Sequence, residues 1–267
     1  MAIALTIVVV VSAAVLAYGW FEAGWLRRRV LEVRIEGLPP ELDGLRIAHL
    51  SDFHLGVPGR GRVASEAAVE WVADRRADLI CLTGDLLTRA RGRPLLEKLL
   101  ARVEPFFVFG NHDIGVGRDP FARQSDLSGL PGTLLRDEGR LVELRGRSVQ
   151  IVGVDPRSYS VRRARPAALA DPAADLRILL CHYPPVVRTL PAGAFQLVLA
   201  GHMHAGQIVI PYPGGKVRLA HLRARLAEGV YRFGDTVLHV SPGLGTTLVP
   251  FRFFARPEVT ELVLRST

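Results

Sequence analysis

The chain has 267 residues, of which 49% are hydrophobic and 22% are charged, and its net charge is +8. This balance is that of a folded protein and excludes an intrinsically disordered chain, and the length suits one large domain or two small ones. The positive charge favours anionic partners such as phosphates, nucleic acid or an acidic membrane surface. Cys81 and Cys181 lie singly in apolar runs, so we expect core residues rather than a disulfide or a zinc site.

The first predicted element is an apolar helix at the N-terminus. No residue from Ala2 to Phe21 is charged, and the stretch is dense in Val, Ile, Leu and Ala. About 20 such residues suffice to cross the hydrocarbon core of a bilayer. We therefore predict a transmembrane anchor over residues 1–25, followed by a single folded domain over residues 30–267.

The residues around the end of this helix predict its topology. Aromatic side chains there suit the membrane interface, arginines follow directly, and no basic residue precedes the helix. These residues are Trp20, Phe21, Trp25, Arg27, Arg28 and Arg29. Because basic residues favour the cytoplasmic side, we predict a single-pass protein of the cell membrane with its folded domain in the cytoplasm. The alternative is a cleaved signal peptide, although neither a basic n-region nor a small-residue cleavage site is clear.

Strand-like and helical stretches alternate after the anchor. Apolar runs predict strands within residues 30–39, 45–52, 77–85 and 105–113, and helical spacing predicts helices over Val63–Arg76 and Leu95–Ala101. The second half is richer in strands, within residues 149–155, 176–184, 195–204 and 236–243. Residues 156–175 are expected to form an irregular surface connection. The repeated strand, turn and helix predict an α/β fold.

Five of these strand-like runs end in Asp, Asn or His. The ends of strands line the ligand crevice in open α/β sheets, so residues distant in the sequence are expected to converge there. Carboxylate, imidazole and amide groups suit a pair of divalent ions such as Mn, Fe, Zn or Mg. Any one of these residues alone is more often structural, and only the ordered set favours a metal site. The set is Asp52, His54, Asp85, Asn111, His112, Asp113, His182, His202 and His204.

The motifs that contain these residues are "SDFH", "TGDL", "GNHD", "CHYP" and "GHMH". In this order they resemble the five blocks of calcineurin-like metallophosphoesterases, over essentially the whole chain after the anchor. "AGQIVIP" and "VSPGLGTTLVPFRFFARPEVTEL" resemble the bacterial membrane-associated phosphodiesterase branch. The resemblance implies a four-layer αββα sandwich of two mixed β-sheets flanked by helices. It also implies two divalent metal ions as cofactors, with manganese favoured over iron and zinc.

The resemblance further assigns a role to each motif residue. It implies Asp52, His54 and His204 for one ion, Asn111, His182 and His202 for the other, and Asp85 as a bridge whose two oxygens span both. His112 would be a catalytic residue that is no ligand and that binds a phosphoryl oxygen or protonates the leaving alkoxide. Relatives in other branches have an Asp where this chain has Thr88, and that Asp orients the motif histidine. Asp113 is the substitute that this sequence offers.

The function implied is a membrane-anchored phosphoesterase with two metal ions, in which a hydroxide held between the ions attacks phosphorus. It would hydrolyse a phosphodiester, phosphomonoester or pyrophosphate bond in a lipid-linked or envelope-precursor substrate. A UDP-diacylglucosamine-type pyrophosphate is one example by analogy. The alternatives are a catalytically silent metal-binding scaffold, against which the complete ligand set argues, and a nuclease, for which no nucleic-acid module is visible. The sequence does not indicate an oligomeric state.

The segment "LVPFRFFARP" near the C-terminus leaves two interpretations open. Its phenylalanines and arginines suit a membrane interface, with rings inserted and guanidinium groups on anionic headgroups. An ordinary core turn of the fold would have the same composition.

Overall fold

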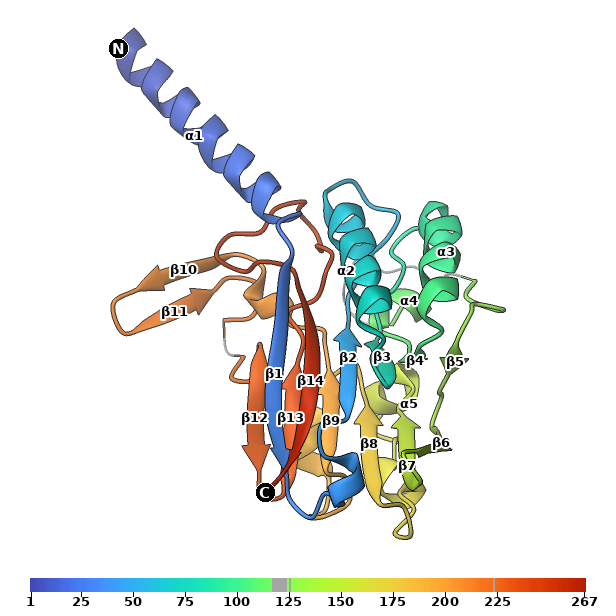
Figure 1. The fold of residues 1–267 in the computed structure, drawn as a ribbon. Helices are drawn as coiled ribbons and strands as arrows, with labels where there is room; N and C mark the ends of the chain where they lie inside the picture. The colour runs from blue at the N-terminus through green and yellow to red at the C-terminus, as the bar shows by residue number, and fades with distance from the viewer. Residues whose placement is uncertain (117–123, 125, 223) are drawn as a thin grey trace.

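Two mixed six-stranded β-sheets form the body of the protein (Figure 1). The computed structural model describes residues 1–116, 124, 126–222 and 224–267. The first sheet has the order β1 (Arg27–Ile35), β14 (Glu258–Ser266), β2 (Arg46–Leu50), β3 (Leu79–Thr83), β4 (Phe106–Val108) and β5 (Thr133–Leu134). The second has the order β12 (Gly229–Phe233), β13 (Thr236–Val240), β9 (Leu197–Ala200), β8 (Leu176–Leu180), β7 (Arg147–Gly153) and β6 (Glu138–Leu144). A separate hairpin comprises β10 (Val209–Tyr212) and β11 (Gly215–Arg218).

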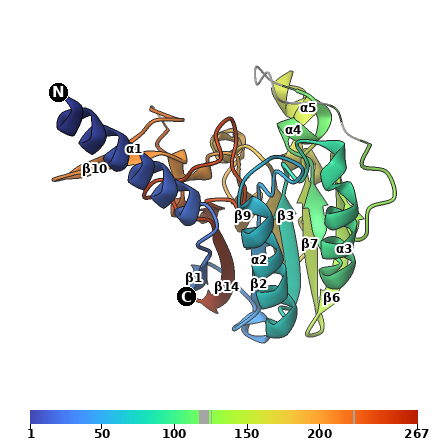
Figure 2. The same ribbon diagram turned by 90° about the horizontal axis from the view of Figure 1, so that it is seen from above.

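Helices cover the outer face of each sheet, which confirms the predicted αββα sandwich (Figure 2). The first sheet packs against α2 (Gly61–Arg75) and α3 (Arg93–Val103). Shorter elements cover the second sheet, namely α5 (Pro156–Ser160), η3 (Pro166–Leu169) and η4 (Pro184–Thr189). The remaining short helices are η1 (Pro40–Leu42), η2 (Ala90–Gly92), α4 (Asn111–Ile114) and η5 (His204–Gly206).

The connection over residues 156–175 is more ordered than its composition suggested. It contains α5 and η3, so the prediction of a wholly irregular segment was wrong. The reason is a local helix start: the Asp155 carboxylate accepts a hydrogen bond from the Arg157 amide at 2.8 Å, and Pro156 occupies the first helical position.

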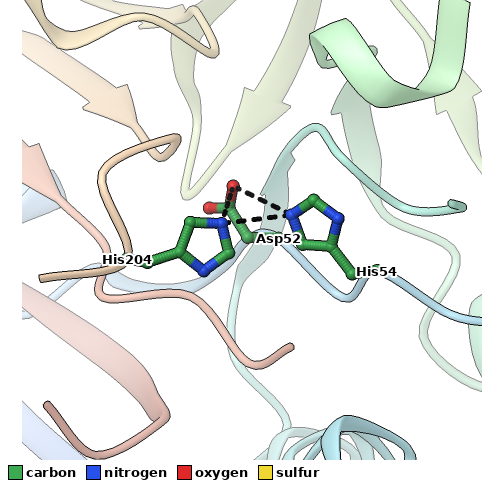
Figure 3. Close-up of side chains that lie close together, drawn as sticks. All are labelled: Asp52, His54 and His204. Atoms are coloured by element: carbon green, nitrogen blue, oxygen red, sulfur yellow. Dashed lines mark hydrogen bonds and ion pairs between the residues drawn. The ribbon is translucent and has the colours of Figure 1, made fainter. Parts of the chain in front are cut away.

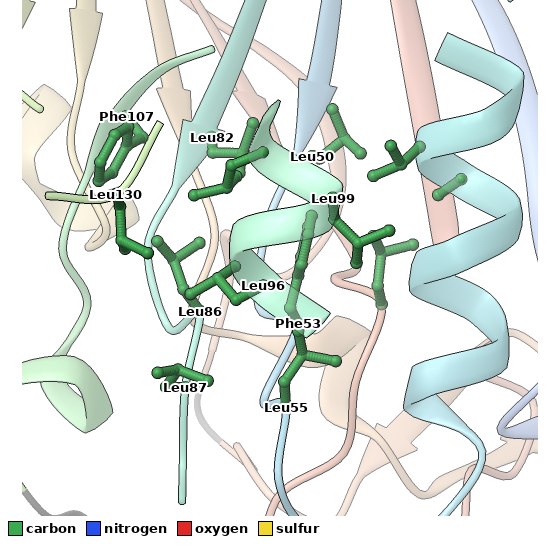
Figure 4. Packing of buried hydrophobic residues seen from close by; sticks show 14 of the residues in the cluster. Leu50, Phe53, Leu55, Leu82, Leu86, Leu87, Leu96, Leu99, Phe107 and Leu130 are labelled. Carbon is green, nitrogen blue, oxygen red and sulfur yellow. The ribbon is translucent and has the colours of Figure 1, made fainter. Parts of the chain in front are cut away.

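The alternation of side chains along the strands divides the core into layers. Leu50 and Leu82 face α2 and α3 (Figure 4), whereas Ile47 and Cys81 on the same strands face the second sheet. Both cysteines are buried and free, as expected, and burial raises the pKa of each thiol to about 12. Continuous burial of both faces holds the strand ends of the two sheets in fixed relative positions.

Two histidines meet between the sheets without belonging to the polar strand ends. Nδ1 of His49 on β2 lies 2.7 Å from Nδ1 of His239 on β13, and both rings are fully buried. Burial lowers the pKa of His239 to about 3, and burial with the charge of His239 lowers that of His49 well below its usual value. The pair is therefore neutral in the folded protein at neutral and mildly acidic pH.

This pair predicts acid sensitivity. Below about pH 6.5 the unfolded chain protonates a histidine that the folded protein keeps neutral, so stability is complete above that pH and is lost as the pH falls. We expect the unfolding free energy of the metal-free protein to decrease as the pH falls, and more steeply in wild type than in His239→Met. The difference between the two slopes should be about 1.4 kcal/mol per pH unit between about pH 5.5 and 4.5. Denaturant titration at several pH values measures both slopes, and parallel slopes would contradict the burial argument.

The N-terminal helix α1 (Ala2–Glu22) projects away from the sandwich (Figure 1). By length and composition it could cross a membrane, and it is the one helix among the described residues that meets this criterion. Most of the helix is exposed, but Gly19 and Glu22 near its C-terminal end are buried, as is Ala23 directly after it. The sheet then begins at Arg27, only a few residues later.

Candidate metal centre

The polar strand ends converge at one edge of the sandwich. Strands β2, β3 and β4 of the first sheet and β8 and β9 of the second all end there, because these strands run in parallel within their sheets. Every residue in the predicted set follows one of these strands, and all are buried except His202, which is half-buried. Residues separated by up to 152 positions in the sequence thus share one site, as expected.

The backbone at these positions is unusual. Left-handed φ angles are uncommon for residues other than glycine, yet five of the seven predicted ligands have them. They are Asp52 (53°), His54 (47°), Asp85 (53°), His202 (72°) and His204 (48°). Backbone strain of this kind persists where the surrounding structure holds it and where a functional geometry requires it.

The first donor group contains Asp52, His54 and His204 (Figure 3). Nε2 of His54 lies 3.1 Å from Nε2 of His204, and Oδ1 of Asp52 lies 3.5 Å from the latter nitrogen and 4.0 Å from the former. The three donor atoms therefore face a common point between β2 and β9.

The second donor group contains Asn111, His182 and His202. Nε2 of His182 lies 3.1 Å from Oδ1 of Asn111 and 3.1 Å from Nδ1 of His202. The two groups are linked through the main chain as well, since the His202 amide donates to both carboxylate oxygens of Asp52 at 3.1 Å.

Asp85 lies between the two groups. Its Oδ2 is 3.4 Å from Nε2 of His54 and 3.3 Å from Nε2 of His182. Its Oδ1 accepts a hydrogen bond from the His112 amide at 2.8 Å. The two carboxylate oxygens were expected to span both groups. In the structure a single oxygen faces both groups, and the other accepts the hydrogen bond at the start of α4.

Hydrogen bonds on the far side of the rings orient two of these donors. Nδ1 of His182 donates to the Thr83 carbonyl at 2.7 Å, which directs its Nε2 towards Asp85. Nδ1 of His54 lies 2.9 Å from Oγ1 of Thr88. Thr88 therefore positions His54. The sequence alone assigned no role to Thr88, which stands where relatives in other branches have an Asp.

The protonation states suit metal binding. Burial lowers the pKa of His54 and His202 to about 3 and that of His204 well below its usual value, so these rings are neutral. Burial also acts to lower the pKa of His182, but the adjacent Asp85 carboxylate outweighs it and raises the pKa to about 9. His182 is therefore protonated at neutral pH and gives up this proton when a cation binds. Three neutral imidazoles, that of His182, carboxylates and an amide oxygen face one another at 3.1 to 4.0 Å, a donor set that fits divalent cations.

Asp113 lies outside both donor groups. Its Oδ1 accepts from the amides of Leu86 and Leu87 at 2.8 and 2.9 Å, and its Oδ2 accepts from the Gly110 amide at 2.8 Å. These three bonds tie the loop after β3 to the loop after β4. Asp113 thus fixes the turns that carry Asp85 and Asn111.

His112 lies beside the first group rather than within it. Its ring packs edge-on against the His54 ring, with centroids 4.6 Å apart, and it borders a cavity of about 710 Å³. A side chain in this position can reach a group bound in the cavity. A ring nitrogen of His112 also lies within 4.8 Å of donor atoms of His54 and Asp85.

Gly110 is needed for the close approach of two loops, which gives a second prediction. A Cβ at this position would lie 2.1 Å from Oδ1 and 2.4 Å from the amide nitrogen of Asp85. Gly110→Ala should displace Asp85, lower kcat/KM on an aryl phosphodiester at least about 100-fold, and destabilise the fold by about 1–3 kcal/mol. Gly139→Ala is the matched control, because its new methyl group would meet the side-chain ends of Gln150 at 3.0 Å and Val152 at 3.3 Å and no residue of the donor groups. Equal activity of the two variants would contradict the prediction that a Cβ at position 110 displaces Asp85.

The fold and the two donor groups define a metal-dependent hydrolase of phosphoesters. The chain belongs to the calcineurin-like phosphoesterase family, whose pattern it matches over residues 45–206. It is 32% identical to the uncharacterized metallophosphoesterase YkoQ of Bacillus subtilis, over 84% of this chain and 85% of that protein. It is 26% identical to the phosphodiesterase YaeI of Escherichia coli, over 92% of this chain and 89% of that protein. A transmembrane protein with metallophosphoesterase domain from Danio rerio is 29% identical over 97% of this chain and 62% of its own length.

Proposed function

We propose that the protein is a membrane-anchored phosphoesterase that hydrolyses a phosphodiester, phosphomonoester or pyrophosphate bond in a lipid-linked substrate. The observation that carries the proposal is a cavity with apolar walls that His112 borders beside the donor groups. The proposal divides the chain into an anchor over residues 1–25 and a catalytic domain over residues 30–267.

In this proposal two divalent ions, with manganese favoured, occupy the two donor groups. Asp52, His54 and His204 would hold one, Asn111, His182 and His202 the other, and Oδ2 of Asp85 would contact both. The ions would neutralise phosphoryl oxygens and supply a nucleophile at neutral pH. The protein orients these donors through Thr83 and Thr88, and places His112 at the cavity to bind a phosphoryl oxygen or to protonate the leaving alkoxide.

The cavity suits an amphiphile. Its apolar walls come from two segments, Val57–Pro58 and Leu248–Pro250, while Arg89 and Arg91 supply positive charge at its border. Leu248 is 65% exposed and Val249 is 40% exposed, although both are aliphatic. An acyl chain against these residues would leave a phosphate near His112, and the arginines would favour a second anionic group.

Residues next to the cavity wall contact the end of the anchor. The Arg60 guanidinium is 5.9 Å from the Phe21 ring centre, and Gly59 packs against Pro250. If α1 crosses a membrane, a substrate enters the cavity directly from the lipid surface. The arginines after α1 favour the cytoplasmic face of the cell membrane for this domain.

Retention of the helix is favoured over removal as a signal peptide. Both carboxylate oxygens of Glu22 accept backbone hydrogen bonds from the C-terminal loop, at 2.7 and 3.0 Å from the amide nitrogens of Ala255 and Phe254. A segment removed after export would not complete the hydrogen bonding of the mature fold. The Danio rerio relative named as a transmembrane protein is consistent with a retained helix.

The test is substrate preference of the full chain in mixed micelles loaded with manganese. We expect a UDP-linked diacylglucosamine or a comparable lipid pyrophosphate to be hydrolysed with a kcat/KM at least about tenfold above that of a soluble aryl phosphodiester. Leu248→Asp should abolish this preference without affecting the aryl substrate, and Leu141→Asp, on the exposed strand β6, should leave both unchanged. Preference for DNA would favour the nuclease, and two bound ions without turnover of any ester would favour the scaffold.

A further inference from the structure

The C-terminal end of α1 is joined to the segment Arg252–Ala255 by direct backbone contacts. The Arg252 amide donates to the Gly19 carbonyl at 3.0 Å, and Glu22 accepts from the next residues as described above. Gly19 allows the approach, since a Cβ there would lie 2.3 Å from the Phe253 ring. Helix end and segment therefore form one packed unit.

The side chain of Arg252 points from this unit into the protein. It is the largest fully buried side chain, with no exposed surface. Its Nε and Nη2 donate to the Gly245 carbonyl at 3.0 and 2.6 Å, and its Nη1 donates to the Ala255 carbonyl at 2.8 Å. Nη2 also lies 3.0 and 3.2 Å from the carbonyls of Pro242 and Gly243. A buried guanidinium is costly unless its donors are satisfied, and here four carbonyl groups satisfy them.

The loop that Arg252 holds is in turn bonded to the first donor group. The amides of Leu244 and Gly245 donate to the Asp52 carbonyl at 3.2 and 2.6 Å. Gly243 approaches Asp52 so closely that a Cβ would lie 2.7 Å from the Cβ of Asp52. Nη2 of Arg252 also lies 3.3 Å from Nδ1 of His204. Arg252 therefore supports two of the three members of this group.

The second donor group has no such support. Within the described part of the chain, none of the hydrogen bonds of Arg252 reaches Asn111, His182 or His202. Any effect of Arg252 should accordingly fall mainly on the first donor group, because the second is linked to Asp52 through the His202 main-chain amide and not through a donor atom.

We propose that Arg252 is a positioning residue that links the docked end of α1 to the metal site formed by Asp52, His54 and His204. The end of α1 then supports the metal centre through Arg252. This inference rests on the proposed function, because it takes the two donor groups to be metal sites.

The test is a manganese titration of the full chain in detergent micelles, followed by calorimetry. Arg252→Lys keeps the charge but loses the fork that reaches both Gly245 and Ala255. We expect one of the two dissociation constants to rise at least tenfold and the other to stay within twofold, with kcat restored when manganese is raised to saturation. Arg256→Lys is the matched control: Arg256 bonds the Trp25 and Leu26 carbonyls at 2.9 and 3.1 Å in the same segment, and both constants should be unchanged.

Glu22→Gln tests the same link from its other end and serves if Arg252→Lys does not fold. One carboxylate oxygen of Glu22, which accepts a hydrogen bond from a backbone N–H, becomes an NH₂ group that cannot accept it. We therefore expect a rise of about threefold or more in the same dissociation constant. Wild-type constants in a folded Arg252→Lys protein, or in Glu22→Gln if it alone folds, would overturn the inference. A wild-type protein that binds fewer than two ions would contradict the proposed function itself, and the inference with it.

Discussion

Asp85→Asn is expected to lower kcat/KM on an aryl phosphodiester by at least about 10⁴-fold, or about 5 kcal/mol of transition-state stabilisation. Oδ2 of Asp85 faces the rings of both His54 and His182, at 3.4 and 3.3 Å. An amide nitrogen in place of that oxygen would put N–H groups where a cation needs a lone pair. The substitution also removes one negative charge from the site. Both donor groups should bind metal more weakly, which manganese titration and steady-state kinetics can measure together.

The contrast with Asp52→Asn makes this prediction specific. Asp52 belongs to the first group, so its variant should lose one ion and retain the other. Both proteins should unfold cooperatively, so that loss of the fold is excluded as the cause. If Asp85→Asn still bound two ions tightly, Asp85 would not be a ligand shared by both ions.

His112→Asn should lower kcat about 10² to 10³-fold for an alkyl phosphodiester, the range that a positioned proton donor supplies. For an aryl ester, whose leaving group needs no proton, the loss should be at least tenfold smaller. The reason is geometric: His112 borders the cavity and packs on the His54 ring, so it can reach the leaving group of an ester bound there. Both ions should remain bound, because neither predicted ligand set includes this ring.

The measurement is a series of esters with increasing leaving-group pKa, assayed for both proteins at saturating manganese. A steeper dependence in His112→Asn supports proton donation. Parallel lines with a constant loss would instead indicate that His112 binds a phosphoryl oxygen. A variant that releases an ion would identify His112 as a ligand and contradict the assignment.

Local patterns predicted the α/β alternation and the polar residues at the strand ends, whereas the four layers were implied by the family resemblance. Each buried parallel strand is a continuous apolar run, and each polar residue that follows it lies at the same edge by the geometry of parallel sheets. The convergence of Asp52, Asp85 and His182 therefore needed only their positions after β2, β3 and β8.

Long-range pairing could not be derived in the same way. Strand β14 lies between β1 and β2, parallel to the first and antiparallel to the second, although it comes last in the chain. Strand β6 has charged residues and little burial, and its pairing with β7 defines it. Such elements depend on partners far away in the sequence, which propensity does not identify.

The position of the Arg252 side chain likewise could not be predicted from the sequence around it. The composition of that sequence suited both a membrane interface and a core turn, and the structure has features of each. Phe254 is 60% exposed beside α1, whereas Arg252 is fully buried and bonded to carbonyl groups. Nothing local distinguishes Arg252 from Arg256, because the acceptors of Arg252 lie on the loop Pro242–Gly245 that the fold brings next to it. The left-handed backbone at the site was equally invisible, since it follows from tight turns between strands and not from residue type.

The measurement that tests the central claim most directly is the number and coupling of manganese ions in the full chain. Elemental analysis after gel filtration in detergent counts the ions, and electron paramagnetic resonance reports whether they are close enough to interact. We predict two ions per chain with a spin-coupled signal that Asp85→Asn abolishes, because one carboxylate oxygen faces both groups. A single ion, or two ions with uncoupled signals in the wild-type protein, would contradict a shared two-metal centre.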